Sequence, residues 1–327
     1  MTDMVFILSL PRSGSTLLQR ILSKSDDIAT FAEPWLMLPM LCAYDGKMTY
    51  SEYGTNLSSL AIKEFVQGSL GEDEYKQELK KFLLSVYGKA SGGKRYCLEK
   101  TPRYALICEE IYDLFPDSKF IVLTRNPLSI CASILSTWSS NRWKMYNYKV
   151  DIYKGIFGLS SFLKKTSSKP NVLHIRYEDL VKSGSRADTI QRIKEHLDLS
   201  LSIGENEDLS QLQIPGRMGD KTGINKYSGF SDSRADFPSD FLCNPLRRYW
   251  AKRYLKQIGR DNLSHLGYSI DELAKDASKS KGYAKFLVSD VARMIYGIIY
   301  DYFEPAIMRD KFLRLIKKSG KSNVCHR

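Results

Sequence analysis

A six-residue segment near the N-terminus combines the side chains that suit the binding of one oxyanion. Gly14 lets the backbone approach an anion closely because it has no Cβ. Arg12 adds a permanent charge with a planar fork of donors, and three hydroxyl side chains add further donors. The segment reads Pro11-Arg12-Ser13-Gly14-Ser15-Thr16. It predicts a phosphate-binding loop, with a serine-rich helix-capping turn as the alternative interpretation.

The same segment lacks the lysine of a Walker A loop. That motif needs a Lys directly after its second Gly, and here Gly14 is followed by Ser15. We therefore expect that this loop does not bind a β- or γ-phosphate and that the need for Mg²⁺ is weaker. Both expectations disfavour a P-loop kinase-like enzyme. The six Cys and four His residues show no metal-site spacing either, so no metal is expected.

A second candidate anion site lies in the middle of the chain. Arg125 follows the apolar run 119–124, and Ser133 comes eight residues later, two turns into a predicted helix. Both side chains can therefore converge on one phosphate dianion. An arginine that makes a salt bridge at a domain edge is the alternative.

Short apolar strands and helical patterns alternate along the chain and would position these residues. The runs 5–10, 119–124 and 172–177 are predicted to be buried strands, and helices are predicted after the first two. Such alternation is typical of an α/β domain with a parallel sheet. Right-handed crossovers then place the loops that follow the strands at one edge of the sheet.

Both candidate phosphate segments resemble those of the sulfotransferases that use 3′-phosphoadenosine 5′-phosphosulfate (PAPS). The family's 5′-phosphosulfate loop reads P-[RK]-S-G-[TS]-T, and residues 115–127 together with Ser133 are similar to its 3′-phosphate segment. The resemblance implies a P-loop-like three-layer fold with a central parallel sheet flanked by helices. It also implies that Arg125 and Ser133 hold the 3′-phosphate of PAPS and that residues 12–16 hold the 5′-phosphosulfate.

The resemblance also implies catalytic roles for Glu33, Arg12 and Lys100. A glutamate at the position of Glu33 serves as general base in tyrosylprotein sulfotransferases, which the stretch 31–35 is similar to. Lys100 lies in a segment that resembles the family's lysine-containing segment, where it would stabilise the bridging oxygen together with Arg12. Glu99 is a rival base, and Arg103 is a candidate for holding an anionic acceptor.

A later loop, residues 217–228, looks like the family's closing loop over the nucleotide. Lys226 is the candidate nucleotide ligand there, although a plain turn explains the glycines of this segment equally well. The likeness covers residues 4–268, so we expect a sulfotransferase domain at 1–268 and a helical, basic C-terminal extension at 269–327. The stretch 274–281 is small and polar and is interpreted as a linker.

The whole chain has 327 residues and a formal net charge of +12, which favours an anionic partner. A nucleic-acid binder is disfavoured because the lysines are dispersed rather than clustered. The N-terminus shows no signal peptide, and no stretch approaches the ~20 apolar residues of a membrane span, so a cytoplasmic location is expected. The extension is expected to pack on its own domain or on a second subunit as a homodimer, with peripheral contact to an anionic membrane as the alternative.

The acceptor is the part of the reaction that the sequence specifies least. We expect a hydroxyl of a carbohydrate or glycolipid to be sulfated. A protein tyrosine is the competing acceptor, because Glu33 and Lys100 match the tyrosylprotein branch.

Overall fold

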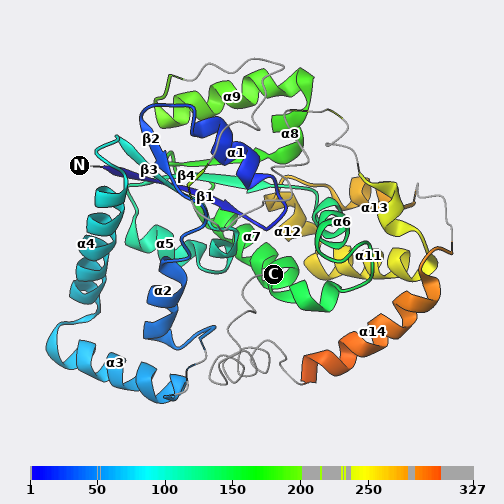
Figure 1. The fold of residues 1–327 in the computed structure, drawn as a ribbon, viewed down its shortest axis with the longest axis horizontal. Helices are drawn as coiled ribbons and strands as arrows, with labels where there is room; N and C mark the ends of the chain where they lie inside the picture. The colour runs from blue at the N-terminus through cyan, green and yellow to red at the C-terminus, as the bar shows by residue number, and fades with distance from the viewer. Residues whose placement is uncertain are drawn as a thin grey trace, which may run out of the picture.

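A computed structural model describes residues 2–49, 51, 53–200, 214–215, 230, 232, 237–278 and 284–302. Its centre is a five-stranded parallel sheet in the order β2-β3-β1-β4-β5 (Figure 1). The strands are β1 (Asp3–Ser9), β2 (Ile28–Thr30), β3 (Tyr96–Glu99), β4 (Lys119–Thr124) and β5 (Val172–Arg176). All four pairings are parallel, so the carboxyl ends of the strands meet at one edge. The predicted α/β class with a central parallel sheet is confirmed.

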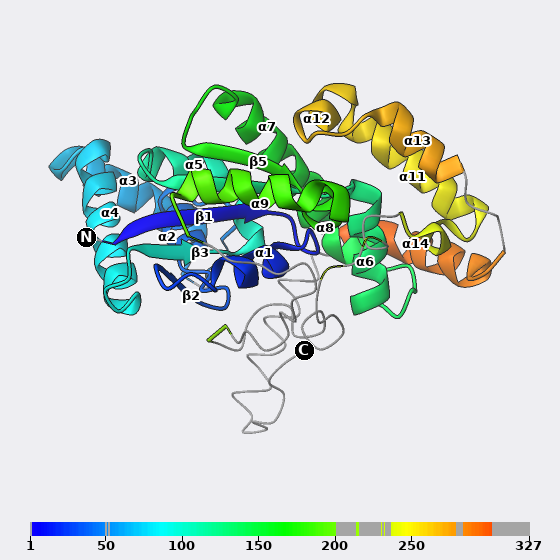
Figure 2. The ribbon, with the colours of Figure 1, turned by 90° about the horizontal axis from the view of Figure 1, so that it is seen from above.

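Helices cover both faces of the sheet, which gives three layers (Figures 1 and 2). Alternate residues of β1 point to opposite faces. Phe6 and Leu8 enter a core with α2 (Met37–Asp45), α4 (Glu72–Ala90), α5 (Cys108–Leu114) and α7 (Ile156–Thr166). Val5 and Ile7 enter a second core with α1 (Ser15–Leu22), α8 (Tyr177–Val181) and α9 (Ser183–Leu197).

The remaining helices extend the first of these layers. They are α3 (Thr55–Ser69), α6 (Pro127–Trp138), α11 (Pro245–Ile258), α12 (Arg260–His265), α13 (Ile270–Ser278) and α14 (Leu287–Tyr302). Short 3-10 turns occupy Pro102–Leu106, Met145–Tyr148 and Ser239–Leu242, and a π-helical turn occupies Val150–Gly155. Figure 1 shows α11, α13 and α14 together, at the end of the molecule opposite α3 and α4.

The structure differs from the sequence-based expectation in three places. The strands β2 and β3 were not predicted, because runs of three and four residues carry little periodic signal. The sequence pattern also predicts helix over 59–88, and the structure has two helices there, separated at Gly71, whose φ of 86° cannot continue an α-helix. The interpretation of 274–281 as a linker is wrong for 274–278, which belong to α13 and bury Ala277 in the core beside α11.

A buried ion pair joins α14 to α11. The Asp290 carboxylate accepts two hydrogen bonds from the Arg247 guanidinium, at 2.7 and 3.1 Å, and a third from Asn244 Nδ2 at 2.8 Å. All three side chains are buried. The first part of the predicted C-terminal extension is therefore packed on the rest of the chain. The boundary at 268/269 stays a prediction.

Within the described ranges, we find no helix whose length and apolar character would suffice for crossing a bilayer.

Candidate active site

The predicted site residues lie on loops that follow the carboxyl ends of neighbouring strands. The loop after β1 carries Arg12 and Gly14, and Lys100 follows β3. Arg125 follows β4, and β5 leads into Tyr177. Because β3, β1, β4 and β5 are adjacent in the sheet, these loops are neighbours in space. This edge is where α/β folds bind their ligands.

The loop after β1 is shaped to receive an anion. Gly14 has a φ of 92°, and a Cβ at this position would lie 2.3 Å from Cδ2 of Tyr177. Among the described residues, no side chain caps the N-terminus of α1, so its first N–H groups are available to a ligand. Ser13 is fully buried, and its Oγ has no hydrogen-bond partner in the part of the chain that the structure describes. These features fit a phosphate group in the loop, as the sequence predicts.

The Arg12 side chain reaches from this loop to helix α6. Its Nε donates to Ser133 Oγ at 3.1 Å, and its Nη2 donates to Thr137 Oγ1 at 3.2 Å. The guanidinium carbon lies 5.6 Å from the ring centroid of Trp138. Arg12, from the predicted 5′ site, therefore contacts Ser133, from the predicted 3′ site. The Arg12 backbone has a φ of 66°, in the left-handed region that costs a non-glycine residue energy.

Arg125, from the predicted 3′ site, makes a second contact with the predicted 5′ loop. Its Nη1 donates to the carbonyl oxygen of Arg12 at 2.9 Å, and its guanidinium lies 4.4 Å from the Tyr177 ring centroid. Its Nε is buried and has no hydrogen-bond partner among the described residues, so one donor remains for a ligand. The structure thus brings Arg12, Arg125 and Ser133 together, as expected for one nucleotide held at two phosphates.

Glu33 and Lys100 form an ion pair at the same edge of the sheet. The distance between Lys100 Nζ and Glu33 Oε1 is 2.9 Å, and the two side chains are 1% and 13% exposed. Trp35 Nε1 donates to the other carboxylate oxygen of Glu33 at 3.4 Å. Glu33, the predicted base, is therefore partly exposed to solvent, and Lys100, the predicted cation, is almost completely buried.

Helix α1 and strand β3 hold the chain that carries Glu33. Gln19 Nε2 donates to Thr30 Oγ1 at 2.7 Å and to the Phe31 carbonyl oxygen at 2.9 Å. Thr30 Oγ1 in turn donates to the Leu98 carbonyl oxygen at 2.9 Å. These bonds fix β2 beside β3, so that Glu33 lies beside Lys100, on the loop that follows β3.

Glu99, the rival base, points into the core rather than to the edge. It is 2% exposed, and Thr101 Oγ1 donates to its Oε1 at 3.0 Å. Burial raises the pKa of the Glu99 carboxyl to about 7, against the opposing effect of nearby hydroxyls and of the Lys100 charge. An acceptor hydroxyl at the sheet edge would not reach this carboxyl, so Glu33 is the better candidate.

Arg103, considered as a ligand for an anionic acceptor, is engaged within the protein. It donates from Nε and Nη2 to the two carboxylate oxygens of Asp151, at 3.1 and 3.3 Å. Burial raises the pKa of Asp151 even though the Arg103 charge acts in the opposite direction. The guanidinium also lies 5.5 Å from the Trp35 ring centroid. Arg103 therefore holds its place beside Trp35 through its ion pair with Asp151.

Other parts of the predicted site are less informative or were missed. Lys226 lies outside the described residues, while Ser15 and Thr16 occupy the first turn of α1. Sequence reasoning missed Tyr177 and Glu178. Tyr177 was counted as the last residue of the predicted strand 172–177, whereas β5 ends at Arg176 and both residues begin α8. The position of a residue after a parallel strand is itself a signal. No group of three or more His, Cys, Asp or Glu side chains that suits a metal occurs in the described segments. The expectation of a metal-free site stays a prediction.

Comparison with known proteins gives a direct family assignment. The sequence profile of the sulfotransferase family matches residues 4–202. Nodulation protein NoeE of Sinorhizobium fredii (strain NBRC 101917 / NGR234) is 37% identical over 136 residues, which is 41% of this chain. That alignment spans only 31% of the length of NoeE.

Two solved structures illustrate the structural likeness. The sulfotransferase domain from the curacin biosynthetic pathway has a TM-score of 0.48 and 20% identity, covering 79% of this chain and 98% of that domain. Mouse sulfotransferase SULT7A1 complexed with PAP has a TM-score of 0.46 and 13% identity, covering 81% of this chain and 88% of that chain. The family profile matches more than half of the sequence, and the chain therefore belongs to the sulfotransferase family.

Proposed function

We propose that this enzyme transfers the sulfuryl group of PAPS to a hydroxyl of a carbohydrate or glycolipid by in-line transfer. One observation carries the proposal for the donor. Arg125 donates to the Arg12 carbonyl while Arg12 donates to Ser133, so the loops that would hold the two phosphate ends of the nucleotide are directly connected. A nucleotide with phosphates on both the 3′ and the 5′ position matches this pair of sites.

The residues around Glu33 suit the transfer step. The bond between sulfur and the bridging oxygen of the donor breaks as the acceptor oxygen forms a new bond to sulfur. Glu33 takes the proton of the acceptor hydroxyl, since its carboxylate is partly exposed at the sheet edge. Lys100 and Arg12 stabilise the negative charge that develops on the leaving phosphate oxygen. The products are adenosine 3′,5′-bisphosphate (PAP) and a sulfate ester.

Aromatic side chains near these groups support a carbohydrate acceptor. Trp138 is 44% exposed, carries the Arg12 guanidinium beside its ring, and lies 5.3 Å from the Tyr148 ring centroid. Trp35 lies between Glu33 and Arg103. The apolar face of a sugar ring packs well on a flat aromatic ring.

A protein tyrosine is the second candidate acceptor. The Glu33–Lys100 ion pair supports it, because the resemblance to tyrosylprotein sulfotransferases rests on the same two positions. Transfer from ³⁵S-labelled PAPS to a purified glycan, compared with transfer to an acidic tyrosine-containing peptide, distinguishes the two acceptors. Sulfate on the peptide alone would replace the carbohydrate proposal.

The donor assignment is tested separately by nucleotide binding. Purified enzyme is titrated with PAP, and we expect Arg12→Ala and Arg125→Ala each to weaken binding by about 10-fold or more, because a charge-assisted hydrogen bond is lost. The control is Arg260→Ala, which changes an exposed arginine that pairs with Asp271. No binding by the wild-type enzyme, or equal binding by all variants, would refute the donor assignment.

A further inference from the structure

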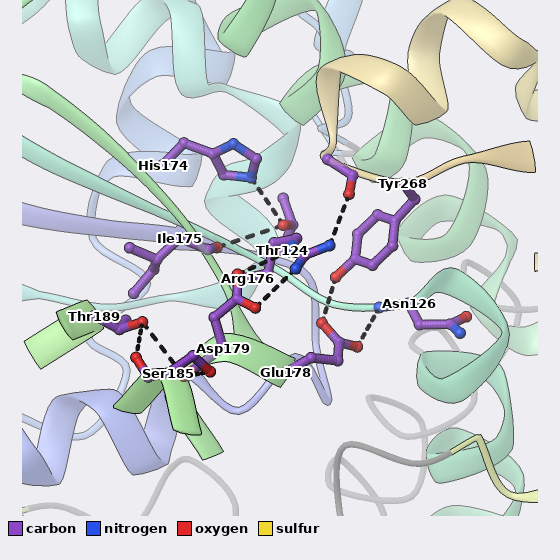
Figure 3. Close-up of polar contacts among 11 residues, drawn as sticks. Thr124, Asn126, His174, Ile175, Arg176, Glu178, Asp179, Ser185, Thr189 and Tyr268 are labelled. Atoms are coloured by element: carbon purple, nitrogen blue, oxygen red, sulfur yellow. Dashed lines mark hydrogen bonds and ion pairs between the residues drawn. The ribbon is translucent and has the colours of Figure 1, made fainter. Parts of the chain in front are cut away.

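Glu178 connects the loop after β4 to the C-terminal part of the chain. Its Oε1 accepts the backbone N–H of Asn126 at 2.9 Å, and its Oε2 accepts the hydroxyl of Tyr268 at 2.6 Å. Figure 3 shows the carboxylate of Glu178 between these two donors. A carboxylate that accepts two short hydrogen bonds is held in one orientation.

The bond to Asn126 fixes the turn that presents Arg125. Asn126 caps helix α6, and its side chain accepts the N–H groups of Leu128 and Ser129 at 2.9 and 3.3 Å. Its own N–H points the other way, to Glu178. The peptide unit that joins Arg125 to Asn126 is thereby held between α6 and α8. The direction in which Arg125 leaves the sheet depends on this peptide.

Tyr268 is itself rigidly placed. The N–H groups of Gly267 and Tyr268 donate to the carbonyl oxygens of Ser264 and Leu263, which is the Schellman arrangement at the end of α12. Arg176 Nη1 donates to the Gly267 carbonyl oxygen at 3.3 Å (Figure 3). Burial and the Glu178 charge raise the pKa of Tyr268 well above its ordinary value, so its hydroxyl stays a donor at neutral pH.

Tyr177, the residue before Glu178, contacts both phosphate loops. Its ring lies beside the Arg125 guanidinium, and it fills the space where a side chain at Gly14 would be. The first turn of α8 therefore sets the position of Arg125 in two ways: through the ring of Tyr177 and through the carboxylate of Glu178.

We propose that Glu178, oriented by Tyr268, is a positioning residue for recognition of the donor's 3′-phosphate. It acts through the Asn126 peptide on Arg125 and does not touch the nucleotide. Removing the Tyr268 hydroxyl would release one carboxylate oxygen, so the Glu178 carboxylate would no longer be held in one orientation against the Asn126 peptide. The anion site would then be less ordered. This inference rests on the proposed function, because it assumes that Arg125 binds the 3′-phosphate.

The test compares two nucleotides that differ only in the 3′-phosphate. Calorimetric titration of the whole enzyme with PAP and with adenosine 5′-phosphate gives a preference ratio. We expect Tyr268→Phe and Glu178→Gln to weaken PAP binding by about 10-fold, as for loss of a hydrogen bond to a charged group. Binding of adenosine 5′-phosphate should change less than about 2-fold, because that nucleotide does not use Arg125.

Tyr254→Phe is the matched control. The Tyr254 hydroxyl is buried and donates to the Ile152 carbonyl oxygen at 2.9 Å. Its loss should lower the unfolding temperature and leave the preference ratio unchanged. If Glu178→Gln does not fold, Tyr268→Phe alone decides, since it keeps the carboxylate.

The possible results separate the inference from the function on which it rests. A preference ratio that stays at the wild-type value in Tyr268→Phe would overturn the inference and leave the function standing. An equal loss of affinity for both nucleotides would overturn it as well, because a merely structural role has that effect. Wild-type enzyme that does not prefer PAP at all would instead overturn the donor assignment, and the inference with it.

Discussion

Lys100 and Glu33 form an ion pair in which the ammonium is almost completely buried and the carboxylate remains partly exposed, with 2.9 Å between Nζ and Oε1. The pairing places the predicted base directly beside the predicted cation. It also makes the two residues mutually dependent, because a buried charge that loses its partner is strongly destabilising. Catalysis and stability are therefore coupled at this pair.

Glu33→Gln should abolish most of the activity while it preserves nucleotide binding. An amide cannot take a proton from the acceptor, so we expect kcat to fall by about 10²- to 10⁴-fold. The affinity for PAP should stay within about 2-fold, because the side chain lies outside the two phosphate loops. Single-turnover assays with labelled PAPS measure the first quantity and calorimetry the second, with Glu64→Gln on the exposed face of α3 as control. Unchanged kcat would exclude Glu33 as the base.

Gly14→Ala should weaken nucleotide binding for a steric reason, and Gly71→Ala, the matched control, should not. A Cβ at Gly14 would collide with the Tyr177 ring, whereas Gly71 has a similar φ, of 86°, and open space around it. Both substitutions should lower the free energy of unfolding by at least about 1 kcal/mol, from the cost of the positive φ, and Gly14→Ala should lower it further because of the collision. Only Gly14→Ala should lower PAP affinity, by more than about 10-fold. Equal PAP binding by the two variants would argue against a phosphate in this loop.

The strands and loops at this edge of the sheet were largely predictable, because short stretches of neighbouring residues determine them. The run 119–124 is apolar and β-branched, and it forms β4 with the predicted bounds. The helix predicted after the first strand is present and begins at Ser15, directly after Gly14. Arg12, Arg125 and Ser133 meet because parallel strands end at the same edge, which is a general property of this fold class.

What escaped prediction depends on contacts between distant segments. β2 and β3 are too short to be recognised alone and exist because they pair with each other and with β1. The rejection of Glu99 as a base required knowing which face of β3 is buried. The partnership of Glu178 with Tyr268 joins residues 90 positions apart, and no local pattern encodes it.

Glu99 should make the stability of the enzyme depend on pH between about 4.5 and 7. Its pKa is raised from an ordinary value of 4.5 to about 7 because burial disfavours the charged form. The folded state therefore holds a proton that the unfolded chain has released. The stabilisation associated with this proton is complete below pH 4.5 and is lost as the pH rises to about 7.

Glu99→Gln removes this titration and keeps an acceptor for Thr101. Relative to wild type, we expect the variant to gain about 3 kcal/mol of unfolding free energy as the pH rises from 4.5 to 8. Urea unfolding at several pH values gives the difference directly. A difference that does not change with pH would mean that Glu99 is already ionised in the folded protein at low pH.

The Asp290–Arg247 pair should contribute to the stability of the whole chain and not only of α14. Asp290 is fully buried and accepts hydrogen bonds from Arg247 and Asn244, while Arg247 Nη2 also donates to the Asn141 carbonyl oxygen at 2.7 Å. Asp290→Ala would leave the guanidinium buried without its counter-charge. We expect a loss of about 3 to 5 kcal/mol in the free energy of unfolding.

Asp271→Ala provides the control from the same region of the chain. Asp271 pairs with Arg260 between α12 and α13, but these side chains are 64% and 71% exposed, so its removal should not measurably change the unfolding midpoint. Urea unfolding followed by tryptophan fluorescence reports on Trp143, whose ring lies 5.7 Å from the Arg247 guanidinium. If Asp290→Ala left the fluorescence transition unchanged, α14 would be an independent appendage. A single transition shifted to lower urea would mean that α14 is an integral part of the folded enzyme.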